Sequence, residues 1–121
     1  MASGIYRLNF NNEYFYVGQS VDIDQRWRQH MDKFYKGTAA EKMQLAFNAF
    51  GDPNGEVLIN CHKDYLDIME TYYIHAQKQF PGCLNTSVPA LDPSINYENI
   101  FNNPQLLQRS ASDLMLSLIH I

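Results

Sequence analysis

The chain has only two cysteines, no long apolar run and no excess of positive charge. Cys61 and Cys83 lie 22 residues apart. Apart from His62, neither has the closely spaced cysteine or histidine partner of a zinc site, so we expect two reduced thiols. The longest apolar stretches are far too short to cross a bilayer, and no charged-then-apolar leader opens the chain. We therefore expect a soluble protein that is not secreted.

Positive charge is scarce and unevenly distributed. Nine Lys and Arg residues stand against 13 Asp and Glu residues, a net charge of −4, which argues against a protein that coats nucleic acid without selection. Residues 1–47 carry six basic and five acidic side chains, whereas the remainder carries three and eight. The positive charge therefore gathers around residues 22–36, and it predicts a local phosphate site with modest affinity for long DNA.

The 121 residues, 45% of them hydrophobic, are enough for one domain with a buried core. Residues 4–10 and 13–19 are β-rich and flank an Asn-Asn pair, which predicts an antiparallel hairpin. Cross-strand neighbours share a face, so Tyr6 and Tyr16 lie on one face only if paired residue numbers add to an even number. We predict an odd-length loop or a bulge, because a plain two-residue turn would separate the tyrosines.

The rest of the pattern predicts an α+β fold in the order ββααβα. This is a small, mostly antiparallel three-stranded sheet flanked by helices. Helix starts are indicated by capping residues and ends by glycine or proline. We expect a first helix that is capped by Asp22, with Gln25 three residues on, and that reaches about Lys36. A second helix is opened by a capping box from Thr38 to Glu41 and stopped by Gly51. After a turn at 52–55 and a strand at 56–62, a third helix is capped by Asp64 and reaches about Phe80.

The chain changes character after residue 87. Residues 88–115 are rich in proline and asparagine and have sparse periodicity, which predicts a linker or a loosely docked tail. Residues 116–121 read Leu-Ser-Leu-Ile-His-Ile, which is one reading frame of a transposon end used to prepare sequencing libraries. We expect an artefact of that kind, with the natural protein continuing past residue 115. A genuine apolar terminal turn is the alternative.

Three polar residues lie within or beside apolar helical patterns. Arg26 and His30 are one turn apart on the same face of the first predicted helix. Glu70 has apolar neighbours one turn away on both sides, and a buried glutamate is rare unless it is paired or bound to metal. An ion pair with Arg7 or Arg26 is one reading. A single carboxylate that holds magnesium together with substrate phosphates is the other, and we favour it.

The two tyrosines need help to act chemically. Tyrosine is an ordinary strand residue, and a free phenol with a pKa of about 10 is a poor base at neutral pH. A nearby cation would lower that pKa. Arg26, or a metal ion at Glu70, could supply it.

Taken together, these residues resemble the GIY-YIG nuclease domain. The resemblance covers about residues 3–87 and is closest to the catalytic domains of phage and intron homing endonucleases. Those proteins carry a short catalytic domain, then a linker, then separate DNA-binding modules. The matching elements, in order, are Gly4-Ile5-Tyr6, Tyr16-Val17-Gly18, Arg26 and His30, Glu70, and Asn85.

The resemblance implies an endonuclease that hydrolyses DNA phosphodiester bonds with one Mg²⁺ or Mn²⁺ ion held by Glu70. Tyr6 would be the general base or would position the attacking water, and Tyr16 would help to position it. Arg26 would neutralise charge that develops on the phosphate. His30 would contact the phosphate or adjust the proton of a tyrosine.

Three further residues would support this site. Asn85 would hold the closing loop near the helix that carries Glu70, and Gly4 and Gly18 would permit close backbone approach. Some homing members have another histidine just after the first helix, where Thr38-Ala39-Ala40 stands here. His30 is then the only imidazole expected near the site.

The resemblance implies DNA as the partner, no membrane, and the cytoplasm of a bacterial or phage-infected cell as the location. It favours a homing or mobile-element endonuclease, present here as a C-terminally truncated fragment. Two alternatives stay open: a restriction or repair nuclease of the same family, and a catalytically inactive DNA-binding module with the same fold.

Overall fold

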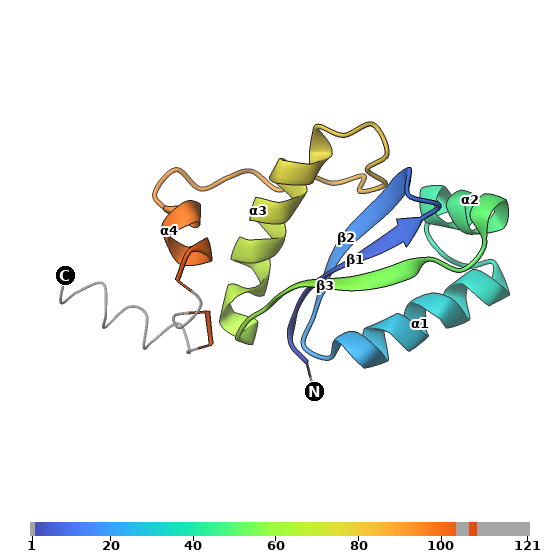
Figure 1. Ribbon diagram of the computed structural model, residues 1–121, viewed down its shortest axis with the longest axis horizontal. Coiled ribbons are helices and arrows are strands. Elements are labelled where there is room, and N and C mark those ends of the chain that lie inside the picture. The colour runs from blue at the N-terminus through green and yellow to red at the C-terminus, as the bar shows by residue number, and fades with distance from the viewer. Residues whose placement is uncertain (1, 104–106, 109–121) are drawn as a thin grey trace.

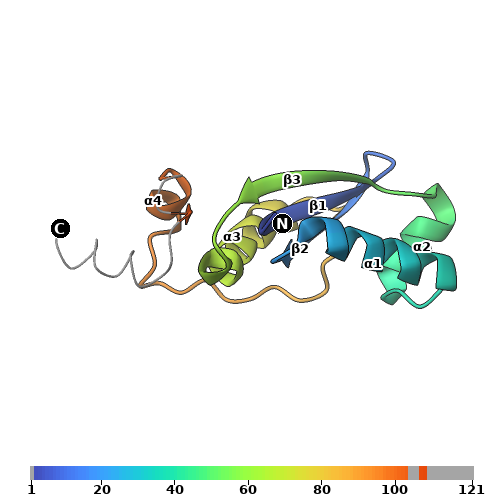
Figure 2. The same ribbon diagram turned by 90° about the horizontal axis from the view of Figure 1, so that it is seen from below.

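The chain folds into a three-stranded antiparallel sheet with helices on both faces (Figures 1 and 2). The computed structural model describes residues 2–103 and 107–108. The elements are β1 (Gly4–Phe10), β2 (Tyr14–Ser20), α1 (Ile23–Lys36), α2 (Glu41–Phe50), β3 (Asn54–Asn60), the 3-10 helix η1 (Lys63–Tyr65), α3 (Leu66–Lys78) and α4 (Tyr97–Phe101). The strand order is β2-β1-β3. The predicted α+β fold in the order ββααβα is confirmed.

The β1–β2 hairpin brings the two tyrosines to one face of the sheet. Tyr6 pairs with Gly18 and Leu8 with Tyr16, so paired residue numbers add to an even number. The loop contains the three residues 11–13, and its two asparagines adopt positive φ angles of 51° and 60°. Asparagine tolerates this left-handed conformation better than most residues. The predicted odd-length loop is confirmed.

Each face of the sheet carries its own apolar core. Figure 1 shows α1 and α2 on one side of the sheet and α3 on the other. Strand alternation explains the division, because successive side chains point to opposite faces. The buried residues of the α1–α2 core are Tyr6, Leu8, Phe10, Ile23, Phe34, Met43 and Ala46. Those of the α3 core are Ile5, Phe15, Val17, Cys61, Tyr65, Leu66, Met69, Ile74 and Leu107.

Helix α1 begins and ends where the sequence predicts. The Asp22 side chain accepts a hydrogen bond from the Gln25 N–H at 3.2 Å. Gly37 ends the helix with a φ of 73°, a left-handed conformation that glycine adopts without cost. The buried residues of α1 are Ile23, His30 and Phe34. They lie along one face of the helix, and Ile23 and Phe34 belong to the core that α1 shares with α2.

The capping box predicted for α2 is wrong. The residue before this helix is Ala40, and no side chain caps it. Thr38 completes the end of α1 instead, because its N–H donates to the Lys33 carbonyl at 2.9 Å. The first-turn N–H groups of α2 are therefore without a side-chain cap, while Gly51 ends the helix as predicted.

Strand β3 begins earlier than predicted. Asn54 pairs with Asn9 and Gly55 with Leu8, so half of the expected turn at 52–55 is strand. The Trp27 indole of α1 packs over Gly55, where an added Cβ atom would lie 1.1 Å from the ring. Gly55 therefore serves close packing and not a turn. The strand ends at Asn60 instead of residue 62.

Asp64 does not cap α3, contrary to the sequence prediction. The 3-10 helix η1 precedes α3, and there His62 Nδ1 accepts a hydrogen bond from the Asp64 N–H at 3.1 Å. Helix α3 then begins at Leu66, after Tyr65, which supplies no side-chain cap. The extra tight turn moves the helix start one residue along the chain, because Tyr65 takes the cap position in place of Asp64. The helix ends at Lys78, two residues before Phe80.

Part of the predicted tail packs on α3. The Phe101 ring of α4 stacks on Tyr72 with a centroid distance of 5.1 Å. Leu107 is 1% exposed and belongs to the α3 core. The boundaries proposed for a linker at 88–115 stay a prediction, and residues 116–121 lie outside the described residues.

The structure bears on the two cysteines and on the shortness of the apolar stretches. Cys61 is buried, Cys83 is half-buried, and both are free thiols, as expected. Within the part of the chain that the structure describes, no helix combines the length and the apolar character needed to cross a membrane.

Candidate active site

Tyr6 and His30 form a buried hydrogen-bonded pair. Tyr6 projects from the middle of β1, and its hydroxyl oxygen lies 2.6 Å from His30 Nε2 on α1. Tyr6 is 1% exposed and His30 is 7% exposed. The imidazole also stacks on Phe34, with a centroid distance of 6.1 Å. The pair is therefore held rigidly just behind the molecular surface.

Tyr16 completes an aromatic cluster with this pair. Its ring centroid lies 6.5 Å from that of Tyr6 and 5.8 Å from that of His30. Tyr16 is only partly buried, so it forms the outer layer of the cluster. The edge strand β2 thus presents one tyrosine at the surface, and the central strand β1 holds the other beneath it.

Gly4 and Gly18 lie where a neighbour comes close. A Cβ atom on Gly18 would be 2.5 Å from the Tyr6 hydroxyl oxygen and 3.0 Å from the Tyr16 ring. On Gly4 it would be 2.1 Å from the Ile59 carbonyl oxygen. Gly18 therefore gives the Tyr6 ring the space it occupies, whereas Gly4 lets β3 approach β1.

Gly18→Ala is expected to destabilise the fold by about 1–3 kcal/mol, because the new methyl group would force the Tyr6 ring away from His30. Thermal or urea unfolding would measure the loss. Val21→Ala, at an exposed position just past β2, is the matched control and should change stability by no more than about 0.5 kcal/mol. Equal stability of the two variants would contradict the tight packing described here.

Arg26 stands one turn before His30 and opens onto a cavity. The cavity has a volume of about 350 Å³. Arg26 Nη1 donates to Gln29 Oε1 at 3.2 Å on the surface of α1, and no carboxylate of the described residues forms an ion pair with it. The guanidinium is therefore available to an anion. The lining residues are Tyr16, Arg26, His30, Lys33, Ala39, Ala40, Glu41, Lys42, Met43, Leu84 and Thr86.

Glu70 lines a smaller cavity that adjoins the first. This cavity has a volume of about 190 Å³, and Tyr16 and Thr86 line both cavities. Tyr16 therefore stands between the Arg26 guanidinium and the Glu70 carboxylate. The predicted site residues are thus brought together, with one qualification: Tyr6 lies beneath Tyr16 and is not part of either cavity wall.

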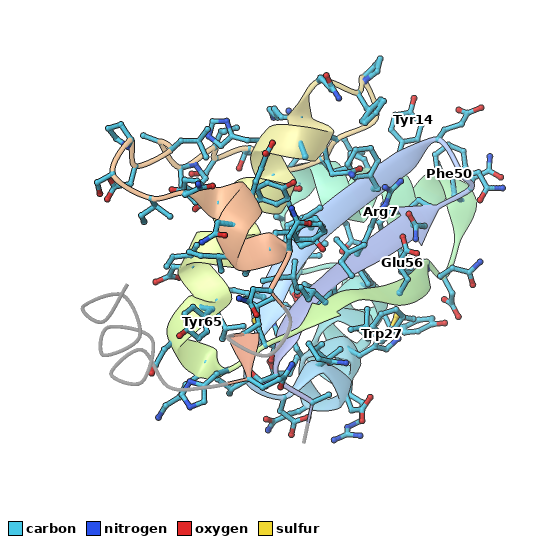
Figure 3. All side chains as sticks on the ribbon, turned by 60° about the vertical axis from the view of Figure 1, so that its left-hand side comes forward. Arg7, Tyr14, Trp27, Phe50, Glu56 and Tyr65 are labelled. Atoms are coloured by element: carbon cyan, nitrogen blue, oxygen red, sulfur yellow. The ribbon has the colours of Figure 1, made fainter. Side chains whose placement is uncertain are left out.

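No ion pair holds Glu70 within the described residues. Arg7, one alternative partner, lies 3.8 Å from Glu56 and donates to Gln77 at 2.7 Å. Figure 3 shows Arg7 and Glu56 beside each other on β1 and β3. Arg26, the other alternative, bonds within α1. The ion-pair reading of Glu70 therefore finds no support.

Burial raises the pKa of the Glu70 carboxyl above its ordinary value. A hydrogen bond from Gln19 acts in the opposite direction, and the nearby Asp67 carboxylate adds to the increase. Gln19 also donates to Asp67 Oδ1 at 2.8 Å. A half-buried carboxylate that resists ionisation gains most from a cation placed beside it.

The tyrosine hydroxyls are harder to ionise than free phenols. Burial raises the pKa of Tyr6, and Tyr16 adds to the increase, whereas Arg26 lowers it by a smaller amount. Burial and Glu70 likewise raise the pKa of Tyr16. The sequence argument allowed Arg26 to lower these values. In the structure its effect has that sign but is outweighed by desolvation.

Asn85 fixes the loop that follows α3 against the edge of the sheet. Its side-chain amide donates to the Val17 carbonyl at 2.8 Å and accepts from the Val17 N–H at 3.0 Å. Lys78 of α3 donates to the Asn85 carbonyl at 2.5 Å. The loop therefore ties the outer edge of β2 to the helix that carries Glu70.

Acid is expected to destabilise the protein through His30. Burial, with help from Arg26 and Lys33, lowers the pKa of His30 to about 4, whereas an unfolded histidine has a pKa of about 6.5. The folded state then binds fewer protons between these values. The stabilisation of up to about 3 kcal/mol is complete above pH ~6.5 and is lost as the pH falls toward ~4.

Chemical denaturation at a series of pH values would measure this dependence. His30→Gln should flatten the slope of unfolding free energy against pH in this window. A His30→Gln slope equal to that of the wild type would contradict the assignment.

Two residues of the site were missed by the sequence argument. Gln19 directly follows the Tyr16-Val17-Gly18 triplet, and strand alternation turns it toward α3 and Glu70. This signal was available, because residue 19 has the opposite parity to Tyr16. Thr86 lines both cavities and had no comparable signal, since its position depends on how the loop after α3 folds back.

A family model described as the GIY-YIG catalytic domain matches residues 2–81. The chain belongs to the GIY-YIG family. The resemblance drawn from the two triplets and the later polar residues is thereby confirmed.

Individual relatives of this GIY-YIG chain are named as intron-associated, intron or homing endonucleases. It is 39% identical over 54 residues to intron-associated endonuclease 1 of Enterobacteria phage T4, a match that covers 43% of this chain and 22% of that protein. The matched part thus spans about a fifth of the length of that curated relative.

Two solved structures share the fold. One is the catalytic domain of a mutant of intron endonuclease I-TevI, with a TM-score of 0.65, 25% identity, and coverage of 76% of this chain and 100% of that chain. The other is the catalytic domain of homing endonuclease I-TevI, with a TM-score of 0.57, 28% identity, and coverage of 69% and 98% respectively.

GIY-YIG nucleases generally depend on a divalent metal. Among the described residues, no group of three or more His, Cys, Asp and Glu side chains could hold a metal ion. Glu70 fits a different kind of site, in which one carboxylate contacts the ion and substrate phosphate and water complete the shell. Its partial burial and its lack of an ion pair within the described residues are consistent with that role.

Proposed function

We propose that this chain is the catalytic domain of a homing or mobile-element endonuclease that hydrolyses phosphodiester bonds of DNA. The observation that carries the proposal is the position of Tyr16 on a wall common to two cavities, with Arg26 and His30 on one side and Glu70 on the other. A guanidinium, a phenol and a carboxylate then face one bound phosphate. Membership of the GIY-YIG family supports the same reaction.

Arg26 binds the phosphate to be attacked. Its guanidinium has no carboxylate partner within the described residues and offers a fork of N–H donors that matches phosphate oxygens. Negative charge grows on these oxygens as the attacking oxygen approaches, so the attraction is stronger in the transition state than in the ground state. Arg26 therefore accelerates the chemical step.

Glu70 is the residue that would hold the divalent cation, Mg²⁺ or Mn²⁺. When bound, the cation acts as a Lewis acid on the phosphate and stabilises charge on the leaving oxygen. Gln19 orients the Glu70 carboxylate from the neighbouring strand. Asn85 keeps the loop over this side of the site through its two hydrogen bonds to Val17.

Tyr16 positions the attacking water, and the Tyr6–His30 pair holds Tyr16 in place. The raised pKa of Tyr6 makes its hydroxyl a poor base at neutral pH. A general-base role for Tyr6 is therefore disfavoured. Because Tyr6 lines neither cavity, it suits a role in holding Tyr16 better than one in positioning the water directly. His30, with a pKa of about 4, is neutral at pH 7, and its Nε2 can accept a hydrogen bond from the Tyr6 hydroxyl at 2.6 Å.

The biological role is proposed from the relatives. Their names refer to introns and homing, which favours a mobile-element nuclease over a restriction or repair enzyme. Because the match spans about a fifth of the curated relative, we propose that target choice depends on protein outside this domain. Its site of action would be the cytoplasm of a bacterial or phage-infected cell.

Incubation with supercoiled plasmid tests the proposal. The chain should nick or linearise the plasmid with Mg²⁺ or Mn²⁺ and should lose this activity when EDTA removes the metal. A chain that binds the plasmid but leaves it intact with either metal would be an inactive DNA-binding module, and the proposed function would fail.

A further inference from the structure

The cavity beside Arg26 has more positive charge than one phosphate requires. Lys33 lies two turns after Arg26 on the same side of α1, and Lys42 lies in the first turn of α2; both line this cavity. Glu41 is the acidic residue of the lining. Three cationic side chains thus face one anionic side chain across the cavity.

Lys33 and Lys42 are not engaged by carboxylates. Among the described residues, neither lysine has an acidic group within ion-pair distance. Lys36 offers a contrast on the same helix, because it lies 3.0 Å from Asp32. His30 adds no charge, since its pKa is lowered to about 4. The two lysines are therefore available to an external anion.

The first turn of α2 adds to the positive character of this wall. The cavity is lined by Ala40, Glu41, Lys42 and Met43, which open the ten-residue helix. No side chain caps Ala40, so the first N–H groups of the helix keep their hydrogen-bonding capacity for another acceptor. Lys42 and the helix dipole then act on the same region of the cavity.

We propose that Lys33 and Lys42 bind a second backbone phosphate of the DNA strand that is cut, adjacent to the phosphate held by Arg26. This inference rests on the proposed nuclease function and deepens it. A volume of about 350 Å³ has room for more than one phosphate group. The lysines are positioning residues: they fix the register of the strand in the site and do not contact the reacting atoms.

A polymeric polyanion suits this site better than a free phosphate ion. Each lysine is an exposed point charge that contributes a modest attraction in water. Linked phosphates allow several such contacts to act on one ligand, and each contact releases counterions from the DNA. The salt dependence of binding therefore reports the number of phosphates that the protein neutralises.

Binding of a fluorescent DNA duplex, measured by anisotropy without divalent metal between about 20 and 150 mM NaCl, tests the inference. Lys33→Gln and Lys42→Gln should each weaken binding by about five-fold to ten-fold near 0.1 M salt. Because both lysines contact one phosphate, the double variant Lys33→Gln/Lys42→Gln should reduce the slope of log K against log salt by about 0.9, and each single variant should reduce it by less. Lys36→Gln, which removes a lysine already paired with Asp32, is the matched control and should keep the wild-type slope.

Glu41→Gln gives a test in the opposite direction. Removing this negative charge from the cavity wall should strengthen binding several-fold, because the charge repels the same phosphate. Circular dichroism would establish that each variant is folded. Unchanged slopes in both lysine variants, or a wild type without salt-dependent binding, would overturn the inference.

The two proposals fail in different ways. A wild type that cleaves plasmid, while both lysine variants bind duplex like the control, would refute the second phosphate site alone. A wild type that binds duplex with the expected lysine dependence but does not cleave would refute the nuclease function and leave the phosphate site in place.

Discussion

Glu70→Gln is expected to reduce metal-dependent cleavage of plasmid DNA by about a thousand-fold or more. Glutamine keeps the shape of the side chain but removes the negative charge that would hold the cation beside Tyr16. The measurement is kcat for plasmid nicking at saturating Mg²⁺, repeated with Mn²⁺. Asp67→Asn is the matched control, because this exposed carboxylate lies one turn earlier on α3 and bonds to the same Gln19. It should keep activity within about tenfold of the wild type.

The same variant is expected to be at least as stable as the wild type at pH 7. The folded-state pKa of Glu70 is raised, so ionised Glu70 is less favourable in the folded than in the unfolded chain. The sign follows directly: a raised carboxyl pKa favours folding at low pH, and that contribution is lost as the pH rises through the folded value. A neutral isostere avoids the loss. Inactivity combined with lower stability would point to a structural role for Glu70 and contradict our assignment.

Arg26→Ala is expected to lower kcat by about 10²-fold to 10³-fold, a typical loss when a group that stabilises transition-state charge is removed. Arg26→Lys should recover part of the loss, because it restores the charge but not the fork of donors. Arg28→Ala, two residues along α1 at an exposed position, is the matched control and should cleave at nearly the wild-type rate. Equal rates for Arg26→Ala and Arg28→Ala would refute the role of Arg26.

A spectroscopic measurement would separate this role from a folding defect. Arg26 contributes to the depressed pKa of His30, so Arg26→Ala should raise the His30 pKa toward its ordinary value, as followed by NMR titration. Burial remains the largest cause of the depression, so the pKa should stay below 6.5. An unaltered His30 titration would show that the guanidinium does not face the imidazole.

The register of the β1–β2 hairpin was predictable because the alternation of side chains along a strand governs it. Strand alternation and the shared face of Tyr6 and Tyr16 required an even pairing sum, and the loop at 11–13 provides it. The start of α1 was equally accessible, since Asp22 caps a turn that lies next to it in the chain. Local chemistry and simple periodicity sufficed in both cases.

The errors arose where two local hydrogen-bonding patterns competed, at Thr38 and Asp64, or where tertiary packing overrode a local pattern, at Gly55. Thr38 matched a capping pattern, but its N–H bonds to the last turn of α1. Asp64 lies within the 3-10 turn that precedes α3 and does not cap that helix. Gly55 is a typical turn residue, yet it lies in β3. The Trp27 ring occupies the space that a Cβ atom at this position would take. Of these contacts, only that of Trp27 with Gly55 joins residues far apart in the sequence; the hydrogen bonds of Thr38 to Lys33 and of Asp64 to His62 are local.

The residue types of the candidate site were predictable from the sequence, but the depth at which each residue lies was not. The sequence could place Arg26 and His30 on one helix face and Glu70 in an apolar arc. It could not show that Tyr6 lies beneath Tyr16 or that burial would outweigh Arg26 in setting the phenol pKa. Both depend on how closely α1 packs against the sheet.

The loop fixed by Asn85 also bears on aggregation. Strand β2 is an edge strand, and its outward backbone groups at Phe15 and Val17 would otherwise invite a strand from another molecule. Residues 82–85 occupy these groups, through Gly82 and Leu84 at Phe15 and through the Asn85 amide at Val17. The loop that closes the site therefore also prevents β-pairing between molecules at this edge. A variant lacking the Asn85 amide would lose solubility as well as order in the site.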